Sequence, residues 1–174
     1  MKSQLPELSE HQIQAGFFQE VNYKYRLDET FRPILLYAVL NGALIGGRNL
    51  QSKSALIQKY KDEGWKSGIP DMMYDQPRGL FSKLVIEFKR TSKRNSHKAG
   101  MLTGGLEPEQ IEFLRAIYPY ALVRVCYTKD EALAAFDYYM ALGQSVLPSM
   151  DEREKIDLPL SAIIKGYDVI NEQP

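Results

Sequence analysis

Gly68-Ile69-Pro70-Asp71 and Ile86-Glu87-Phe88-Lys89 are the two segments from which the fold of this chain is best predicted. The second segment has the pattern of a β-strand, in which successive side chains point to opposite faces of the sheet. Glu87 and Lys89 therefore share one face of the strand. The apolar side chains on its other face point toward a core: Leu84, Ile86 and Phe88.

The first segment predicts the start of a neighbouring strand, because proline suits the first position of a strand and cannot donate to a ladder interior. If that strand lies beside the second segment, the carboxylate of Asp71 joins that of Glu87. Two carboxylates offer hard oxygen ligands for a divalent cation, and the ammonium of Lys89 lies next to them. Phosphodiester hydrolysis requires this combination of groups.

The alternative interpretation is that Glu87 and Lys89 form an ion pair on an exposed strand, which would contribute little to stability. The apolar residues on the opposite face favour a central, buried strand instead. Buried acids without a metal ion or a partner are costly, so a functional site explains the pair better.

The composition predicts one soluble globular domain followed by a tail. The chain has 174 residues, of which 44% are hydrophobic and 25% are charged, enough for a single substantial core. No apolar run approaches the length of a membrane span, and the polar N-terminal sequence lacks a signal-peptide pattern, so we expect a cytoplasmic protein with no membrane partner. The single cysteine, Cys126, lies in an apolar run and is expected to be buried.

The net charge of zero conceals a basic segment that directly follows Lys89. A local basic patch steers a polyanion even on a neutral chain. The alternative is an ordinary solvated loop, but the position beside Lys89 favours phosphate binding. The cations predicted to bind nucleic acid are Arg90, Lys93, Arg94 and Lys98.

Hydrophobic periodicity and capping residues predict helices that alternate with strands. A helix over 9–25 begins with a capping box of Ser9 and Gln12, and another over 128–140 begins with one of Thr128 and Glu131 and closes at Gly143. The remaining predicted elements are a strand over 34–39, a helix over 52–62 with Leu56, Ile57 and Tyr60 inward, strands from 71 and over 83–89, a helix opening at 106–110, and a strand over 121–126.

This order predicts an α/β fold whose central strand is covered on both faces. Residues 1–142 form the predicted domain, and residues 143–174 form a C-terminal extension with a short helix over 161–166, which packs on the core or on a dimer partner. His11 and His97 are interpreted as incidental, because each lies in a polar environment where a solvent-exposed histidine is common.

The ordered motifs resemble the PD-(D/E)XK nuclease superfamily and, within it, the virus-type replication-repair nuclease family, VRR-NUC. The resemblance covers roughly residues 8–141 and implies a restriction-endonuclease-like core, a mixed central sheet flanked by helices. Glu107 departs from the family pattern, in which a small hydroxylated residue is common. The motifs are a helix bearing Glu10, Asn41-Gly42, the two segments quoted first, Leu106-Glu107-Pro108-Glu109-Gln110, and Asp130-Glu131-Ala132.

The resemblance also implies a metal site that binds Mg²⁺ or Mn²⁺. Asp71 and Glu87 would be its carboxylate ligands, the main-chain carbonyl of Phe88 a further ligand, and Glu10 would complete the shell directly or through water. A metal ion held there lowers the pKa of a bound water and offsets charge on the scissile phosphate.

The resemblance implies that two further residues act on the substrate. Lys89 would orient the attacking water and stabilise the charge of the transition state, and Gln110 would hydrogen-bond to Lys89 or to a phosphate oxygen. Asn41, in the Asn-Gly turn, joins the predicted nucleic-acid-binding residues.

Two functions from different classes follow. The first is a metal-dependent endodeoxyribonuclease of DNA repair that acts on branched DNA such as a four-way (Holliday) junction, working as a homodimer in a bacterial or phage-infected cell. The second is a non-catalytic nucleic-acid-binding protein that retains the nuclease fold. The complete set of predicted metal and lysine residues favours the enzyme.

Overall fold

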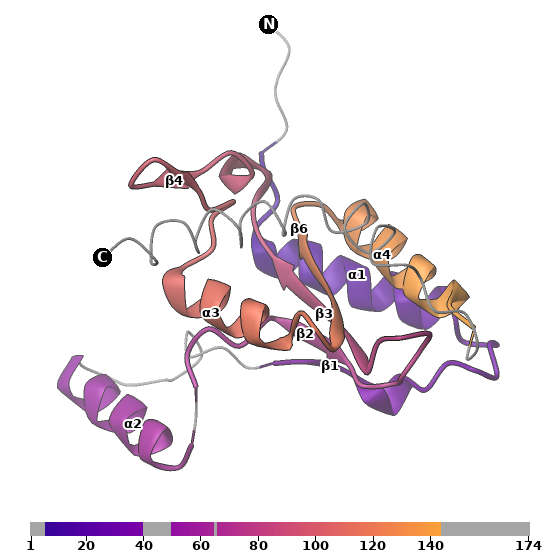
Figure 1. Cartoon of the computed structure of the whole chain (residues 1–174), viewed down its shortest axis with the longest axis horizontal. Coiled ribbons are helices and arrows are strands. Elements are labelled where there is room, and N and C mark those ends of the chain that lie inside the picture. The colour runs from indigo at the N-terminus through magenta and orange to yellow at the C-terminus, as the bar shows by residue number, and fades with distance from the viewer. Residues whose placement is uncertain (1–5, 40–49, 65, 144–174) are drawn as a thin grey trace, which may run out of the picture.

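The computed structural model describes residues 6–39, 50–64 and 66–143 as an α/β fold around one four-stranded sheet (Figure 1). Its strands lie in the order β1-β2-β3-β6. The first three are antiparallel neighbours, whereas β3 and β6 run parallel, so the central sheet is mixed, as predicted. The strands are β1 (Leu36–Ala38), β2 (Met72–Tyr74), β3 (Lys83–Phe88) and β6 (Ala121–Cys126).

Helices cover both faces of this sheet (Figure 1). Helices α1 (Glu10–Lys24) and α4 (Lys129–Ala141) pack against each other and against β3 on one face, while α3 (Pro108–Ile117) covers the other. Helix α2 (Leu50–Asp62) lies apart from the sheet. The basic segment after β3 forms a 3-10 turn, η3 (Thr91–Lys93), and then a small hairpin of β4 (His97–Lys98) and β5 (Met101–Leu102), which the sequence did not predict.

The alternation predicted for β3 is confirmed. Leu84, Ile86 and Phe88 are buried in the cluster beneath α1 and α4, where Phe88 meets the ring of Phe17. Val85, on the opposite face, belongs to the smaller cluster beneath α3. β3 is a central strand, since it pairs with β2 and with β6, and apolar side chains are buried on both of its faces. Cys126 is buried, as expected.

The two predicted capping boxes have different outcomes. Ser9 and Gln12 form the full reciprocal box at the start of α1. Thr128 accepts from the backbone N–H of Glu131, but the carboxylate of Glu131 binds the Tyr127 amide and Arg94 instead of closing the second box. The second prediction is therefore half right, because a distant cation competes for the glutamate.

Three local predictions are corrected by the structure. Pro33 starts a 3-10 turn, η1 (Pro33–Leu35), so the predicted strand over 34–39 shortens to β1 and Ile34 is exposed. Tyr60 is exposed on α2 rather than inward. Helix α4 ends at Ala141 with an extended residue after it, so Gly143 does not cap it.

Several predictions lie outside the described residues: the Asn41-Gly42 turn and the C-terminal extension with its helix over 161–166. Gly143 is the one residue of the predicted extension that is described, and its carbonyl accepts from the amide of Gly79. Within the described ranges, every helix is too short or too polar to cross a membrane.

Candidate active site

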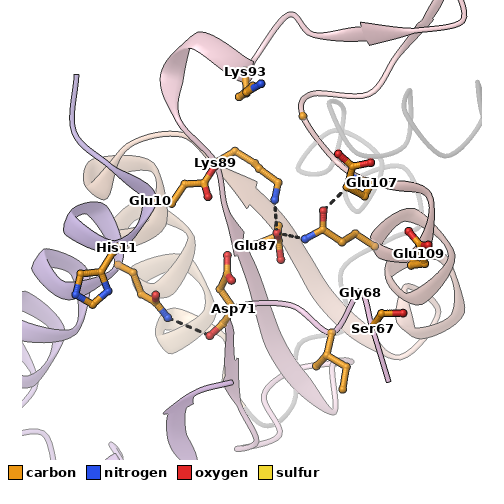
Figure 2. Close-up of a pocket in the computed structure, with 14 residues that line it drawn as sticks. Glu10, His11, Ser67, Gly68, Asp71, Glu87, Lys89, Lys93, Glu107 and Glu109 are labelled. Carbon is orange, nitrogen blue, oxygen red and sulfur yellow. Dashed lines mark hydrogen bonds and ion pairs between the residues drawn. The ribbon is translucent and has the colours of Figure 1, made fainter. Parts of the chain in front are cut away.

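The sheet brings Asp71 and Glu87 together. Strands β2 and β3 pair antiparallel, with Met72 opposite Ile86 at the end of the ladder. Continuing this register by one residue places Asp71 opposite Glu87, as predicted from the two segments. Both carboxylates point into one cleft (Figure 2).

Glu87 is almost fully buried, with 1% of its surface exposed. Its Oε1 atom accepts from the Nζ of Lys89 at 2.5 Å and from the side-chain amide of Gln110. Its Oε2 atom is buried and has no hydrogen-bond partner among the described residues. Burial raises the pKa of the Glu87 carboxyl, and the nearby Asp71 carboxylate raises it further, to about 7, although the Lys89 ammonium acts in the opposite direction.

Asp71 is fixed by contacts from three elements. Its Oδ2 atom accepts from the backbone N–H of Phe88 at 2.9 Å. Its main-chain carbonyl accepts from the amide of Val39 at 2.8 Å and from the side chain of Gln14 on α1 at 3.1 Å. In an extended strand the N–H and C=O of a residue point toward the same edge, so the Phe88 carbonyl also faces the Asp71 side. That orientation agrees with the carbonyl ligand predicted for Phe88.

Gln110 is oriented by the start of α3. Its Oε1 atom accepts from the backbone N–H of Glu107 at 3.0 Å, which leaves its NH₂ group to donate to Glu87. Gln110 therefore hydrogen-bonds to the carboxylate that binds Lys89, rather than to Lys89 itself as one form of the prediction had it. Because one oxygen of Glu87 is engaged by two donors, the other oxygen is directed away from them.

Gly68 holds the segment that leads to Asp71 against α3. It has φ of +78°, and a Cβ atom at this position would lie 2.4 Å from the main-chain carbonyl of Glu109. Only glycine permits this backbone conformation together with so close an approach. The glycine thereby fixes the distance between the two parts of the site, Asp71 on one side and Gln110 on the other.

Two carboxylates at the start of the described chain, Glu7 before α1 and Glu10 at its first position, hold the basic segment in place. Glu10 accepts from the backbone N–H of Arg90 at 3.3 Å. Glu7 accepts from the backbone N–H of Ser92 at 2.6 Å and from its hydroxyl at 2.9 Å, and these hydrogen bonds lower the pKa of the Glu7 carboxyl. Both contacts fix the backbone immediately after Lys89, and so they fix the direction from which its side chain enters the site.

An open cleft of about 690 Å³ lies between α1, the sheet and the start of α3 (Figure 2). Glu10 and His11 stand on one side of it, and Glu107 and Glu109 on the other. Six residues that were assigned to the site from the sequence line this cleft: Glu10, Asp71, Glu87, Lys89, Lys93 and Gln110. Arg90, Arg94 and Lys98 lie outside its lining, and Asn41 lies outside the described residues.

The predicted phosphate-binding cations differ in their surroundings. Arg94 pairs with Glu131, and its guanidinium lies 4.4 Å from the ring centre of Tyr127. Lys98 pairs with Glu107 at 3.4 Å. Lys93 lines the cleft and packs on Gly105, where an added Cβ would lie 2.7 Å from the Cβ of Lys93. Of the four predicted cations, Lys93 is the one that lines the cleft.

Several residues of the site were not predicted from the sequence. Gln14 lies one turn after Glu10 on the same helix face, and that spacing was the available clue to its role. The spacing of Glu107 and Gln110 is that of a capping box, which would have predicted how the glutamine is oriented. Glu7 precedes the helix and contacts a segment far along the chain, so no local pattern points to it.

The donor groups fit a divalent cation. The buried Oε2 atom of Glu87 has no donor among the described residues, and a cation would satisfy it. The oxygens of Asp71, Glu87 and the Phe88 carbonyl are the ligand type that Mg²⁺ and Mn²⁺ prefer. No three His, Cys, Asp or Glu side chains in the described part of the chain gather closely enough to hold a metal ion. Mg²⁺ is commonly bound by one or two carboxylates, with water molecules and substrate phosphates as its other ligands.

A comparison with solved structures supports the resemblance on which the assignment depends. The chain is similar to a protein described as a VRR_NUC domain protein, with a TM-score of 0.56 and 23% sequence identity over 83% of this chain and 100% of the other. At this identity the likeness establishes the shared fold. No family model matches the sequence. No curated protein matches it either.

Proposed function

We propose that this protein is a metal-dependent endonuclease that hydrolyses phosphodiester bonds of DNA. The observation that carries the proposal is the buried Glu87 carboxylate, with one oxygen held by Lys89 and Gln110 and the other without a donor in the described residues, beside Asp71. Burying an acid in this way costs stability unless a bound cation satisfies it, and such a cost is expected at a functional site. The fold shared with a VRR_NUC domain protein supports the same assignment.

In this proposal Asp71 and Glu87 would hold Mg²⁺ or Mn²⁺, assisted by the carbonyl of Phe88, and Glu10 would complete the shell through water, because no third acid among the described residues lies close enough to bind the ion directly. The bound ion would lower the pKa of a water molecule and offset charge on the scissile phosphate. Lys89 orients the attacking water and adds positive charge close to the phosphate. Its ammonium lies at the cleft wall with only 9% of the residue exposed, which strengthens its electrostatic effect relative to a solvated lysine.

The remaining residues of the cleft position these groups. Gln110 keeps Glu87 in one orientation, and Gln14 and the Phe88 amide keep Asp71 in place. Lys93 lines the cleft and would bind a phosphate of the substrate next to the scissile one. Preorganised groups of this kind need no rearrangement when charge develops during the reaction.

We further propose a branched DNA substrate, such as a four-way junction, cut by a homodimer of the chain. Two coordinated cuts on opposite strands require two active sites related by symmetry. Gel filtration of the purified protein, alone and with a junction, tests this part separately from the chemistry. A monomer in both samples would contradict it.

The chemical proposal is tested with labelled four-way junction, linear duplex, flap and single-stranded DNA in Mg²⁺ or Mn²⁺. Wild-type protein should cleave at least one of them, and Lys89→Ala and Asp71→Ala should not. Lys83→Ala is the matched control, because Lys83 is a lysine of the same strand that pairs with Asp75 and does not line the cleft. This variant should cleave like the wild type.

Two results would overturn the assignment. Cleavage that persists in Lys89→Ala would contradict the assigned mechanism. Tight DNA binding by the wild type without metal-dependent cleavage would favour the non-catalytic nucleic-acid-binding protein.

A further inference from the structure

We infer that Glu107 limits nucleic-acid binding at the cleft by pairing with Lys98, so that a phosphate must compete with its carboxylate for this lysine. The inference rests on the proposed function. Glu107 would thus lower the affinity for nucleic acid. Lys98 would differ from the other cations of the basic segment in that its binding to phosphate depends on Glu107.

The ion pair joins Lys98, which lies outside the cleft lining, to a residue of that lining. The Nζ atom of Lys98, on β4, lies 3.4 Å from Oε2 of Glu107, which immediately precedes α3 and lines the cleft. The side chains are 63% and 68% exposed. A pair so exposed is weak because water screens it, and a phosphate reaching the lysine therefore competes with the carboxylate on nearly equal terms.

Arg94 provides the contrast within the same basic segment. Its guanidinium is held by both the Glu131 carboxylate and the Tyr127 ring, and neither of these residues lines the cleft, whereas Glu107 does. Two contacts fix the guanidinium in the fold, whereas one exposed contact leaves Lys98 able to exchange partners. The competition is therefore specific to the Lys98 and Glu107 pair.

Glu107→Gln removes the charge but keeps the side-chain oxygen that serves in the capping box of Glu107 and Gln110, so the orientation of Gln110 is retained. The start of α3 is stabilised by Gln110, which accepts from the backbone N–H of Glu107, a group that every residue except proline has. The neighbouring Glu109 lines the same side of the cleft and has no ion pair within the described part of the chain. Glu109→Gln therefore removes the same charge from the same side and serves as the matched control.

The test measures DNA affinity in a Lys89→Ala background, which keeps the DNA intact, over a series of salt concentrations. Glu107→Gln should raise affinity by about two- to fivefold, and the salt dependence should steepen by roughly one released counterion. Lys98→Ala should weaken binding more in the Glu107→Gln protein than in the protein that keeps Glu107. In the Glu109→Gln protein, Lys98→Ala should have the same effect as in the protein that keeps both acids.

Two outcomes would overturn the inference. An equal effect of Lys98→Ala with and without Glu107 would show that the two residues are not coupled, even if the wild type binds and cleaves DNA. Failure of the wild type and of every variant to bind any DNA would overturn the inference and the proposed function together. Wild-type cleavage in the substrate panel thus separates the two failures.

Discussion

The two faces of β3 differ in what they contribute. The face toward α1 and α4 carries Leu84, Ile86 and Phe88, each at most 1% exposed and packed in a core rich in aromatic rings. The face toward the cleft carries Val85 and Glu87, with Lys89 directly after the strand. The strand is largely buried on both faces, yet only one of them is wholly apolar.

This difference separates stability from chemistry within a single strand. Burial of the apolar side chains stabilises the fold, whereas burial of Glu87 with an oxygen that no described residue satisfies opposes it. Positions where a sequence departs from the pattern that would be most stable are expected at functional sites. Substitutions on the two faces should therefore affect different properties of the protein.

The largest effect is expected from Glu87→Gln. Loss of a carboxylate ligand and of several kcal/mol of charge stabilisation should slow cleavage by roughly a thousandfold. Thermal stability should stay the same or fall, because the amide removes one buried charge but leaves the Lys89 ammonium without its carboxylate partner. Cleavage assays and thermal unfolding of the same sample check both statements. A variant that cleaves within tenfold of the wild type would show that the charged face is not the active site.

Phe88→Ala breaks the comparison from the other face. Removing this buried ring should lower the free energy of unfolding by about 3–5 kcal/mol, measured by urea denaturation. Phe88→Leu should cost distinctly less, because it keeps most of the apolar volume. Equal losses for both variants, or none, would contradict the assignment of this face to the core.

Gln110→Glu tests whether Gln110 orients Glu87 on the charged face of β3. The new carboxylate retains the acceptor for the Glu107 amide but can no longer donate to Glu87 when ionised. We expect cleavage to fall by roughly 10- to 100-fold, as for other residues that orient metal ligands. Glu112→Gln, on the exposed side of α3, is the control and should leave the rate unchanged. A wild-type rate in Gln110→Glu would refute the orienting role.

The smallest effects concern the basic segment beside the site. Arg94→Ala should lower the free energy of unfolding by about 1 kcal/mol through the loss of its ion pair and ring contact, and change DNA affinity little. Lys93→Ala should weaken DNA binding and reduce the salt slope by about one counterion, with stability unchanged. A loss of DNA affinity in Arg94→Ala together with a loss of stability in Lys93→Ala would contradict the roles assigned to the two residues.

Strand alternation made the charged face predictable from the sequence. A side-chain period of two is sufficient to assign Glu87 and Lys89 to one face, and the order of the motifs added Asp71 and Gln110. The mixed sheet with helices on both faces is confirmed. The alternation is local in the sequence, whereas the mixed sheet was expected from the resemblance carried by the order of the motifs.

Contacts between distant segments account for what the sequence did not reveal. Arg94 belongs to a basic run, but its partner Glu131 lies 37 residues later, on α4. Glu7 binds Ser92 across 85 residues. The strand expected over 34–39 failed for a different reason, since Pro33 favours a turn that overrides the apolar run. Charge and hydrophobicity alone do not identify these partners.

Metal binding by the charged face of β3 is tested most directly through stability, independently of any DNA substrate. Thermal unfolding of the wild type and of Glu87→Gln is measured with increasing Mn²⁺. The wild type should be stabilised progressively, by about 2.7 kcal/mol at a metal concentration one hundred times the dissociation constant, and Glu87→Gln should show little change. No stabilisation of the wild type, or equal stabilisation of both proteins, would contradict a metal site at Asp71 and Glu87.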